Sequence, residues 1–210
     1  MSKILLVCAH PDDEILGVGG TVARLVRDGH EIVVGFLITR DMMQQIESAR
    51  AVLGYKGIAF AQYQDQRLDM VPLLEVTQWV ERLLSDFPAE IVYTHHNGDL
   101  NLDHRIVSQA VLTATRPQGR CTVKEVYAFE TPSSTEWGFG QIQPVFQPNV
   151  FVDVDDVWSE KIKAWQCYSG EMREIPHPRA ITRLAGRAEY WGAISGLKTA
   201  EAFQLVRSVR

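Results

Sequence analysis

The stretch Lys3-Ile-Leu-Leu-Val-Cys-Ala-His-Pro-Asp-Asp-Glu14 decides the fold of this chain and the place of its chemistry. Its apolar first part, residues 3–9, has the length and the branched side chains of a buried strand. Glycines at positions 17, 19 and 20 come next, and apolar residues at helical spacing follow them. A histidine and three carboxylates therefore crowd the carboxyl end of a strand, where ligands bind in open parallel sheets.

These polar residues have two interpretations. In the simpler one, a solvated acidic loop precedes a helix that Asp12 or Asp13 caps. Two adjacent aspartates repel each other, however, and the repulsion is tolerated best when a cation lies between them. A single aspartate would favour the loop, whereas a histidine and three acidic residues at one strand end favour a metal site.

The next part of the chain alternates between strand and helix patterns. Strands are expected at residues 31–38, 90–94 and 123–129, and helices at residues 42–54, 72–85 and 101–114. An alternation of this length is typical of a parallel sheet with right-handed crossovers. The predicted class is α/β, with a Rossmann-like, mainly parallel sheet flanked by helices.

After residue 130 the pattern changes. A loop rich in Ser, Thr and Pro runs to residue 148 and precedes a strand at residues 150–154. Helices are expected at residues 156–169, 178–195 and 198–206, and together they predict a C-terminal helical appendage. No repeat, low-complexity tract or linker divides the sequence, so we expect one domain over residues 1–210.

The composition limits the classes of partner. The net charge is −5, and no block of basic residues indicates nucleic acid binding. No apolar run approaches the roughly 20 residues that cross a bilayer, and the first strand begins so early that we expect no signal peptide. Cys8, Cys121 and Cys167 lie far apart, which fits reduced thiols in a cytoplasmic protein. We expect a small molecule as the partner, with a homo-oligomer as a possible assembly.

Two polar runs supply candidate metal ligands. Catalytic Zn²⁺ takes three protein ligands and leaves one position for water. His10 and Asp13 have the spacing for two ligands from one turn, and His104, in the second run at residues 95–105, is the best third candidate. Asp103 is suited to orient a ligand as a supporting carboxylate. Asp12, beside the metal, is placed to act as the general base of metal-assisted hydrolysis.

These residues resemble the motifs of a known family. His10-Pro-Asp-Asp-Glu14, the following Gly-x-Gly-Gly and Asp103-His-Arg105 are similar to those of the PIG-L/LmbE-like deacetylases, and the resemblance covers nearly the whole chain. It implies a Zn²⁺-dependent hydrolase, with other divalent cations possible, that removes acetyl from an N-acetylated amino sugar or its conjugate. It also implies that His10, Asp13 and His104 bind the metal and that Asp12 is the base.

The sequence departs from the common family pattern at Asn101, where many members have a histidine that helps the tetrahedral intermediate. An asparagine can donate a hydrogen bond to an oxyanion but cannot deliver a proton. The simpler interpretation is that Asn101 caps its helix. The general acid is therefore open, and His177, His96 and Asp99 are the alternatives.

His177 lies between two prolines, which restrict the backbone on both sides. One hypothesis is that its imidazole points at the oxygen of the tetrahedral intermediate, in its own site or in that of an oligomer partner. Arg179 would then hold this segment or a substrate oxygen. The alternative is that the segment only ends one helix before the next begins at Pro178.

Further polar residues are candidates for substrate binding. Arg40, Asp65 and Arg67 follow strand-like segments, where family members tend to hold sugar hydroxyls, and Asp99 lies in the second polar run. The alternative for each is a structural ion pair or a loop cap.

Two rival functions use the same sheet. A nucleotide-binding dehydrogenase is disfavoured because its Gly-x-Gly-x-x-Gly should follow the first strand at once, whereas acidic residues intervene here. A metal-binding protein that binds a sugar or nucleotide sugar without catalysis is the second rival. The presence of Asp12 disfavours it, because a purely structural site does not need a base.

Overall fold

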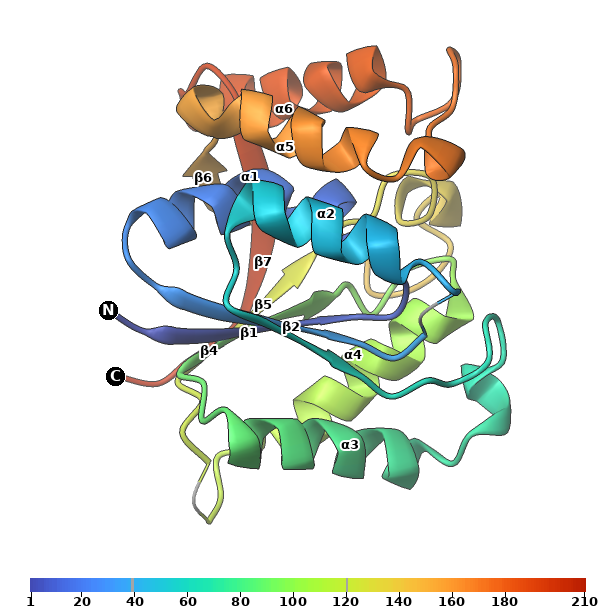
Figure 1. Cartoon of the computed structure of the whole chain (residues 1–210), viewed down its shortest axis with the longest axis vertical. Coiled ribbons are helices and arrows are strands. Elements are labelled where there is room, and N and C mark those ends of the chain that lie inside the picture. The colour runs from blue at the N-terminus through green and yellow to red at the C-terminus, as the bar shows by residue number, and fades with distance from the viewer. Residues whose placement is uncertain (39, 120) are drawn as a thin grey trace.

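The computed structural model describes residues 1–38, 40–119 and 121–210. Within these residues, seven strands form one sheet in the order β3-β2-β1-β4-β5-β7-β6 (Figure 1). The first five of these run parallel, whereas β7 is antiparallel to both of its neighbours, β5 and β6. The strands are β1 (Lys3–Cys8), β2 (Glu31–Phe36), β3 (Gly57–Phe60), β4 (Ile91–His95), β5 (Glu125–Phe129), β6 (Val150–Asp153) and β7 (Ala200–Ser208). The predicted α/β class with a mainly parallel sheet is confirmed.

Helices cover both faces of the sheet (Figure 1). One face carries α1 (Asp13–Arg27) and α2 (Met43–Leu53), and α5 (Trp158–Gln166) packs across both of these helices, while α6 (Ile181–Ser195) packs on β6 and β7. The other face carries α3 (Leu73–Asp86) and α4 (Leu102–Ala114). The buried apolar side chains form one cluster on each face. In the described residues, no helix combines the length and the apolar character that crossing a membrane requires.

The predicted helix at residues 198–206 is wrong. This segment forms β7, which lies between β5 and β6. Its alanine, glutamate, glutamine and leucine residues favour a helix locally. The unpaired edge of β5 offers hydrogen bonds to a strand, and Phe203 packs edge-on against the ring of Tyr93 in the core. Tertiary pairing thus overrides local propensity, and the last segment of the chain is a strand of the main sheet, whereas the other C-terminal helices are present as α5 and α6.

The glycines after the first strand let α1 lie close to the sheet. A Cβ atom on Gly17 would come within 2.3 Å of the Phe129 ring, and one on Gly20 within 2.7 Å of Val154. The backbone N–H groups of Gly20 and Thr21 donate to the buried carboxylate of Glu201 on β7. These glycines therefore serve helix packing, and the carboxyl end of β1 is held against the neighbouring strands.

Candidate metal centre and active site

The two polar runs meet because β1 and β4 are neighbours in the sheet. His10 and Asp13 follow the end of β1, and His104 lies in the first turn of α4, shortly after β4. All three side chains are buried, with at most 2% of their surface exposed. The structure brings together the three residues that the sequence predicted as metal ligands.

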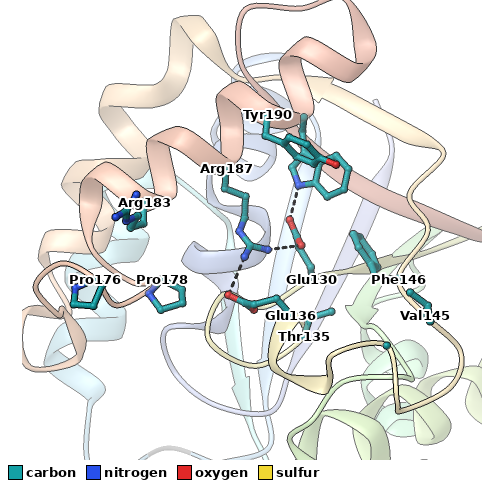
Figure 2. Close-up of a pocket in the computed structure, with 12 residues that line it drawn as sticks. Glu130, Thr135, Glu136, Val145, Phe146, Pro176, Pro178, Arg183, Arg187 and Tyr190 are labelled. Carbon is teal, nitrogen blue, oxygen red and sulfur yellow. Dashed lines mark hydrogen bonds and ion pairs between the residues drawn. The ribbon is translucent and has the colours of Figure 1, made fainter.

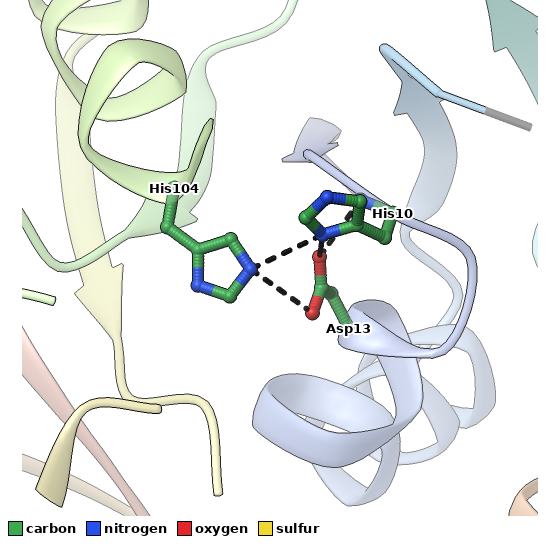
Figure 3. A group of neighbouring side chains, drawn as sticks. All are labelled: His10, Asp13 and His104. Atoms are coloured by element: carbon green, nitrogen blue, oxygen red, sulfur yellow. Dashed lines mark hydrogen bonds and ion pairs between the residues drawn. The ribbon is translucent and has the colours of Figure 1, made fainter. Parts of the chain in front are cut away.

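One ring nitrogen from each histidine and the two carboxylate oxygens of Asp13 lie close together, so that the three side chains form a small triangle (Figure 3). His104 Nε2 lies 3.2 Å from His10 Nδ1 and 3.5 Å from Asp13 Oδ1, and His10 Nδ1 lies 3.4 Å from Asp13 Oδ2. A tetrahedral Zn²⁺ with ligands at about 2.0–2.2 Å spaces those ligands about 3.3–3.6 Å apart. Asp13 Oδ1 is also buried without a hydrogen-bond partner. The residues present therefore fit a zinc ion.

The electrostatics of the triangle also favour a cation. Burial lowers the pKa of His10, but hydrogen bonds with Asp103 and Asp13 outweigh it and raise the pKa to about 9. Burial raises the pKa of Asp13, but His104 and His95 outweigh it and hold the pKa well below its ordinary value. A proton and a metal ion compete for the same ring nitrogen, so a site that attracts the proton strongly also attracts the ion.

A second carboxylate lies behind each histidine of the triangle. Asp103 Oδ2 is 3.1 Å from His10 Nε2, and its other oxygen accepts a hydrogen bond from the backbone N–H of Leu68. Asp99 Oδ1 is 3.2 Å from His104 Nδ1. Such carboxylates fix the orientation of ligating imidazoles. The orienting role predicted for Asp103 matches its position.

Asp99 lies elsewhere than expected for a substrate-binding residue. Its side chain is fully buried and accepts hydrogen bonds from the hydroxyls of Ser134 and Thr135 and from the backbone N–H of Asn101. Burial raises its pKa, but His104 and the hydroxyls outweigh this and lower it. The carboxylate is enclosed between His104 and these donors, and direct substrate contact by Asp99 stays a prediction.

His95 is also part of the site. Its ring stacks on that of His104 at 3.9 Å between centroids, and its Nε2 accepts the backbone N–H of Ala9. Burial, and then the nearby His104, lowers the pKa of His95 to about 4. A neutral ring therefore supports the metal ligand from behind. The only sequence signal was its position as the last residue of β4.

Asp12 adopts an unusual backbone conformation. Its φ is 104°, in a region of backbone conformation that residues other than glycine rarely adopt. The buried carboxylate of Glu14 accepts the backbone N–H of Asp12 at 2.9 Å and the hydroxyl of Tyr168 at 2.6 Å. Glu14 thereby holds Asp12 in its strained position. The hydrogen bond between Tyr168 and Glu14 joins residues that lie far apart in sequence, and the sequence did not predict it.

The two carboxylate oxygens of Asp12 have different environments. Oδ2 accepts a hydrogen bond from Arg179 at 2.8 Å, whereas Oδ1 is buried without a partner. Burial, followed by repulsion from Asp13, raises the pKa of Asp12 to about 7, and Arg179 opposes the rise. A buried carboxylate with one free oxygen and a pKa near neutrality has the properties of a general base.

Arg179 connects the C-terminal segment to the site. Its guanidinium also contacts Ser133 Oγ at 2.8 Å and Glu171 at 3.2 Å. The neighbouring His177 accepts the backbone N–H of Arg179 through Nδ1 and packs edge-on against Trp137. In the described residues no hydrogen bond joins His177 to the three ligand residues, and its role as a proton donor stays a prediction.

Asn101 has the capping role that the simpler interpretation gave it. Its side-chain oxygen accepts the backbone N–H of Asp103 at the start of α4. A catalytic role of its amide stays a prediction. His96 is occupied elsewhere, since its Nε2 lies 2.7 Å from the carbonyl oxygen of Pro144.

Two of the remaining predicted substrate residues, Arg40 and Asp65, lie at the edge of the site. Arg40 and Asp65 form an ion pair at 2.8 Å, and Asp65 Oδ1 is 3.4 Å from His10 Nε2. Burial lowers the pKa of Arg40, but Asp65 outweighs it and raises the pKa. The side chain of Arg67 is exposed. The ion-pair alternative thus describes Arg40 and Asp65 as they stand, and substrate contact by all three residues stays a prediction.

Two relatives are similar to this chain over most of its length. An uncharacterized deacetylase, YaiS, from Escherichia coli is 29% identical over 170 residues, which cover 73% of this chain and 82% of that protein. A diacetylchitobiose deacetylase from Thermococcus kodakarensis is 24% identical over 235 residues, which cover 100% of this chain and 85% of that protein.

The fold also occurs in an enzyme of another kind. The crystal structure of GalB, the 4-carboxy-2-hydroxymuconate hydratase from Pseudomonas putida KT2440, superposes with a TM-score of 0.77 and 23% sequence identity. The match covers 100% of this chain and 98% of that one. This likeness concerns the fold alone.

One family matches the part of the chain that carries both polar runs. The PIG-L family, described as GlcNAc-PI de-N-acetylase, matches residues 5–115, which is more than half of the sequence. This range contains the residues of the triangle, Asp12 and the orienting carboxylates. The chain therefore belongs to the PIG-L family of deacetylases.

Proposed function

We propose that this protein is a zinc-dependent hydrolase that removes acetyl from an N-acetylated amino sugar or a conjugate of one. The observation that carries the proposal is that His10, Asp13 and His104 bring side-chain atoms within 3.2 to 3.5 Å of one another, while the preceding residue Asp12 has a buried Oδ1 without a partner. Membership of the PIG-L family and the deacetylase names of two relatives support an acetylated substrate.

His10, Asp13 and His104 would hold the metal, and two imidazoles with one carboxylate are a donor set typical of catalytic zinc. Other divalent cations also accept these ligands. When bound, the metal acts as a Lewis acid that polarises a carbonyl group and lowers the pKa of water.

Asp12 would move the proton. Its free Oδ1 accepts a proton from the water molecule as the water oxygen attacks the amide carbonyl carbon. The carbon–nitrogen bond then breaks, the nitrogen takes up a proton, and the products are acetate and the free amine. Arg179 holds Oδ2 during these steps, so that the same oxygen of Asp12 faces the reaction. His177 and Asn101 stay candidates for hydrogen bonding to the oxygen of the tetrahedral intermediate.

The proposal is tested by acetate release from a panel of N-acetylated amino sugars, combined with metal analysis. Wild-type protein loaded with one zinc should release acetate. Asp12→Asn should keep its zinc and lose roughly 10²- to 10⁴-fold in kcat, the usual contribution of a general base. Zinc loss in Asp12→Asn, with activity kept per bound metal, would assign Asp12 as a ligand and reverse the proposed roles.

The same panel separates the rival functions. Bound zinc without acetate release from any sugar would favour a sugar-binding protein that does no chemistry. The shared fold of GalB motivates one further assay, in which an unsaturated carboxylated acid is offered and the addition of water is followed by loss of its ultraviolet absorbance. Turnover of that acid without acetate release would identify a hydratase and refute the deacetylase proposal.

A further inference from the structure

A cavity of about 560 Å³ lies between α6 and the loop that follows β5 (Figure 2). Its walls are mainly apolar and include Tyr190, Trp191, Phe146 and Pro178. None of the three predicted metal ligands lines it. Its volume is in the range of small-molecule sites, which are typically apolar with a few polar groups.

The carboxylates of the cavity are already occupied by protein groups. Arg187 contacts Glu130 and Glu136, and Trp191 Nε1 donates to the second oxygen of Glu130 (Figure 2). Glu136 also accepts the backbone N–H of Ser133 at 2.9 Å. A ligand rich in hydroxyls would find these acceptors engaged, whereas the faces of the aromatic rings stay available. The cavity therefore suits an apolar group better than a sugar ring.

One charged group in the cavity has no protein partner. Within the described parts of the chain, the exposed guanidinium of Arg183 makes no hydrogen bond or ion pair, although the side chain lines the cavity. Arg187, by contrast, lies between two carboxylates that balance its charge. An anionic group on a ligand would complement Arg183, and a carboxylate matches the planar guanidinium in shape.

The cavity shares two walls with the active site. Ser133 contacts Arg179 through its hydroxyl and Glu136 through its backbone, and Arg179 in turn contacts Asp12. On the other wall, Thr135 lines the cavity and donates to Asp99, which lies behind His104. The cavity is thus connected to His104 through Thr135 and Asp99, and to Asp12 through Glu136, Ser133 and Arg179.

We propose that this cavity binds the part of the substrate that lies beyond the N-acetylated sugar. That part is an apolar aglycone, which is either an aromatic ring or a short acyl chain. It carries an acidic group that faces Arg183. The inference rests on the proposed function, and it narrows the substrate class from amino sugars in general to acidic, apolar conjugates of them.

Calorimetry with three probes tests this inference: N-acetylglucosamine, its phenyl β-glycoside and its 4-carboxyphenyl β-glycoside. Burial of the phenyl ring should tighten binding to the wild type about tenfold relative to the free sugar. Tyr190→Ala should remove most of that gain. Arg183→Gln should weaken only the carboxyphenyl probe, by severalfold and less at high salt. Ile194→Ala, on an exposed position of the same helix outside the cavity, is the matched control and should change nothing.

The binding experiment and the acetate assay can fail separately. Absence of acetate release refutes the proposed function, while the calorimetry still reports whether the cavity takes an acidic aryl group. Equal affinity of the wild type for all three probes overturns the inference. So does an equal loss for all probes in Tyr190→Ala. A change of oligomeric state in Tyr190→Ala, together with no preference for the aryl probes, would instead identify this face as a contact between two copies of the chain.

Discussion

Replacing Glu14 by alanine should destabilise the protein and impair catalysis, although Glu14 is fully buried behind the base. The change leaves the backbone N–H of Asp12 and the hydroxyl of Tyr168 without their acceptor. Each unsatisfied buried donor costs about 1–3 kcal/mol. The strained φ of 104° at Asp12, which costs about 1–3 kcal/mol, also loses the contact that maintains it.

We therefore expect Glu14→Ala to lower the free energy of unfolding by about 3–5 kcal/mol, since the chain relaxes around part of the lost contacts. Once relaxed, Asp12 should leave its position, and a displacement of about 1 Å at a reacting group costs roughly 100-fold in rate. Chemical denaturation and steady-state kinetics on the zinc-loaded protein measure the two effects.

Two further variants make this prediction specific. Glu14→Gln keeps an acceptor for Asp12 and a donor for the Tyr168 oxygen, so its stability should fall by no more than about 1 kcal/mol. Glu47→Ala, which removes an exposed carboxylate that pairs with Arg50, should be nearly neutral. A Glu14→Ala protein with wild-type stability and kcat would refute the idea that Glu14 holds the base.

The same residue predicts a pH dependence of stability. Burial raises the pKa of Glu14 from 4.5 to about 8, with the Tyr168 hydrogen bond opposing and the Asp12 charge adding to the rise. The folded form thus binds one more proton than the unfolded form between these values, and stability should fall as pH rises through this window. In chelator-treated protein, the free energy of unfolding should fall more steeply from pH 5 to 8 in the wild type than in Glu14→Gln. A steeper fall in the variant would contradict the assignment.

Three other expectations follow from the site. His10→Ala, Asp13→Ala and His104→Ala should each lose zinc by orders of magnitude, because no spare ligand replaces the one removed, and full zinc content in any of them would exclude that residue. Asp99→Asn should weaken zinc binding about 10- to 100-fold in a competition titration, as is usual for a carboxylate that orients a ligating histidine. His177→Ala should lower kcat while zinc content and melting temperature stay unchanged, whereas unaltered kcat would leave the segment only its structural role; Thr182→Ala, at an exposed position on the following helix, is the control.

The sequence predicted the parts of the site that local spacing controls. His10 and Asp13 share one turn, and the second polar run follows a recognisable strand, so parallel pairing of β1 and β4 was enough to bring His104 to them. The fold class followed from the alternation of strands and helices in the same way.

The contacts that sequence reasoning missed join residues far apart in the chain. Tyr168 donates a hydrogen bond to Glu14, 154 positions earlier in the sequence, and the residues around neither of them predict it. Asp99 looked available to substrate because burial by Ser134 and Thr135 depends on how a later loop folds back. The strand β7 was mistaken for a helix for the same reason, since the edge of β5 that it fills is formed by another part of the chain.

The position of β7 has a consequence for how the protein is made. In sequence β7 follows β6, yet in the sheet it lies between β5 and β6. During synthesis β6 therefore has no neighbour in the sheet until β7 has left the ribosome, and the carboxylate of Glu201 reaches the backbone of α1 only then. Until then the edge of β5 in the nascent chain is unpaired, and an unpaired sheet edge is prone to aggregation. The surroundings of α1 are therefore complete only after β7 has paired with β5.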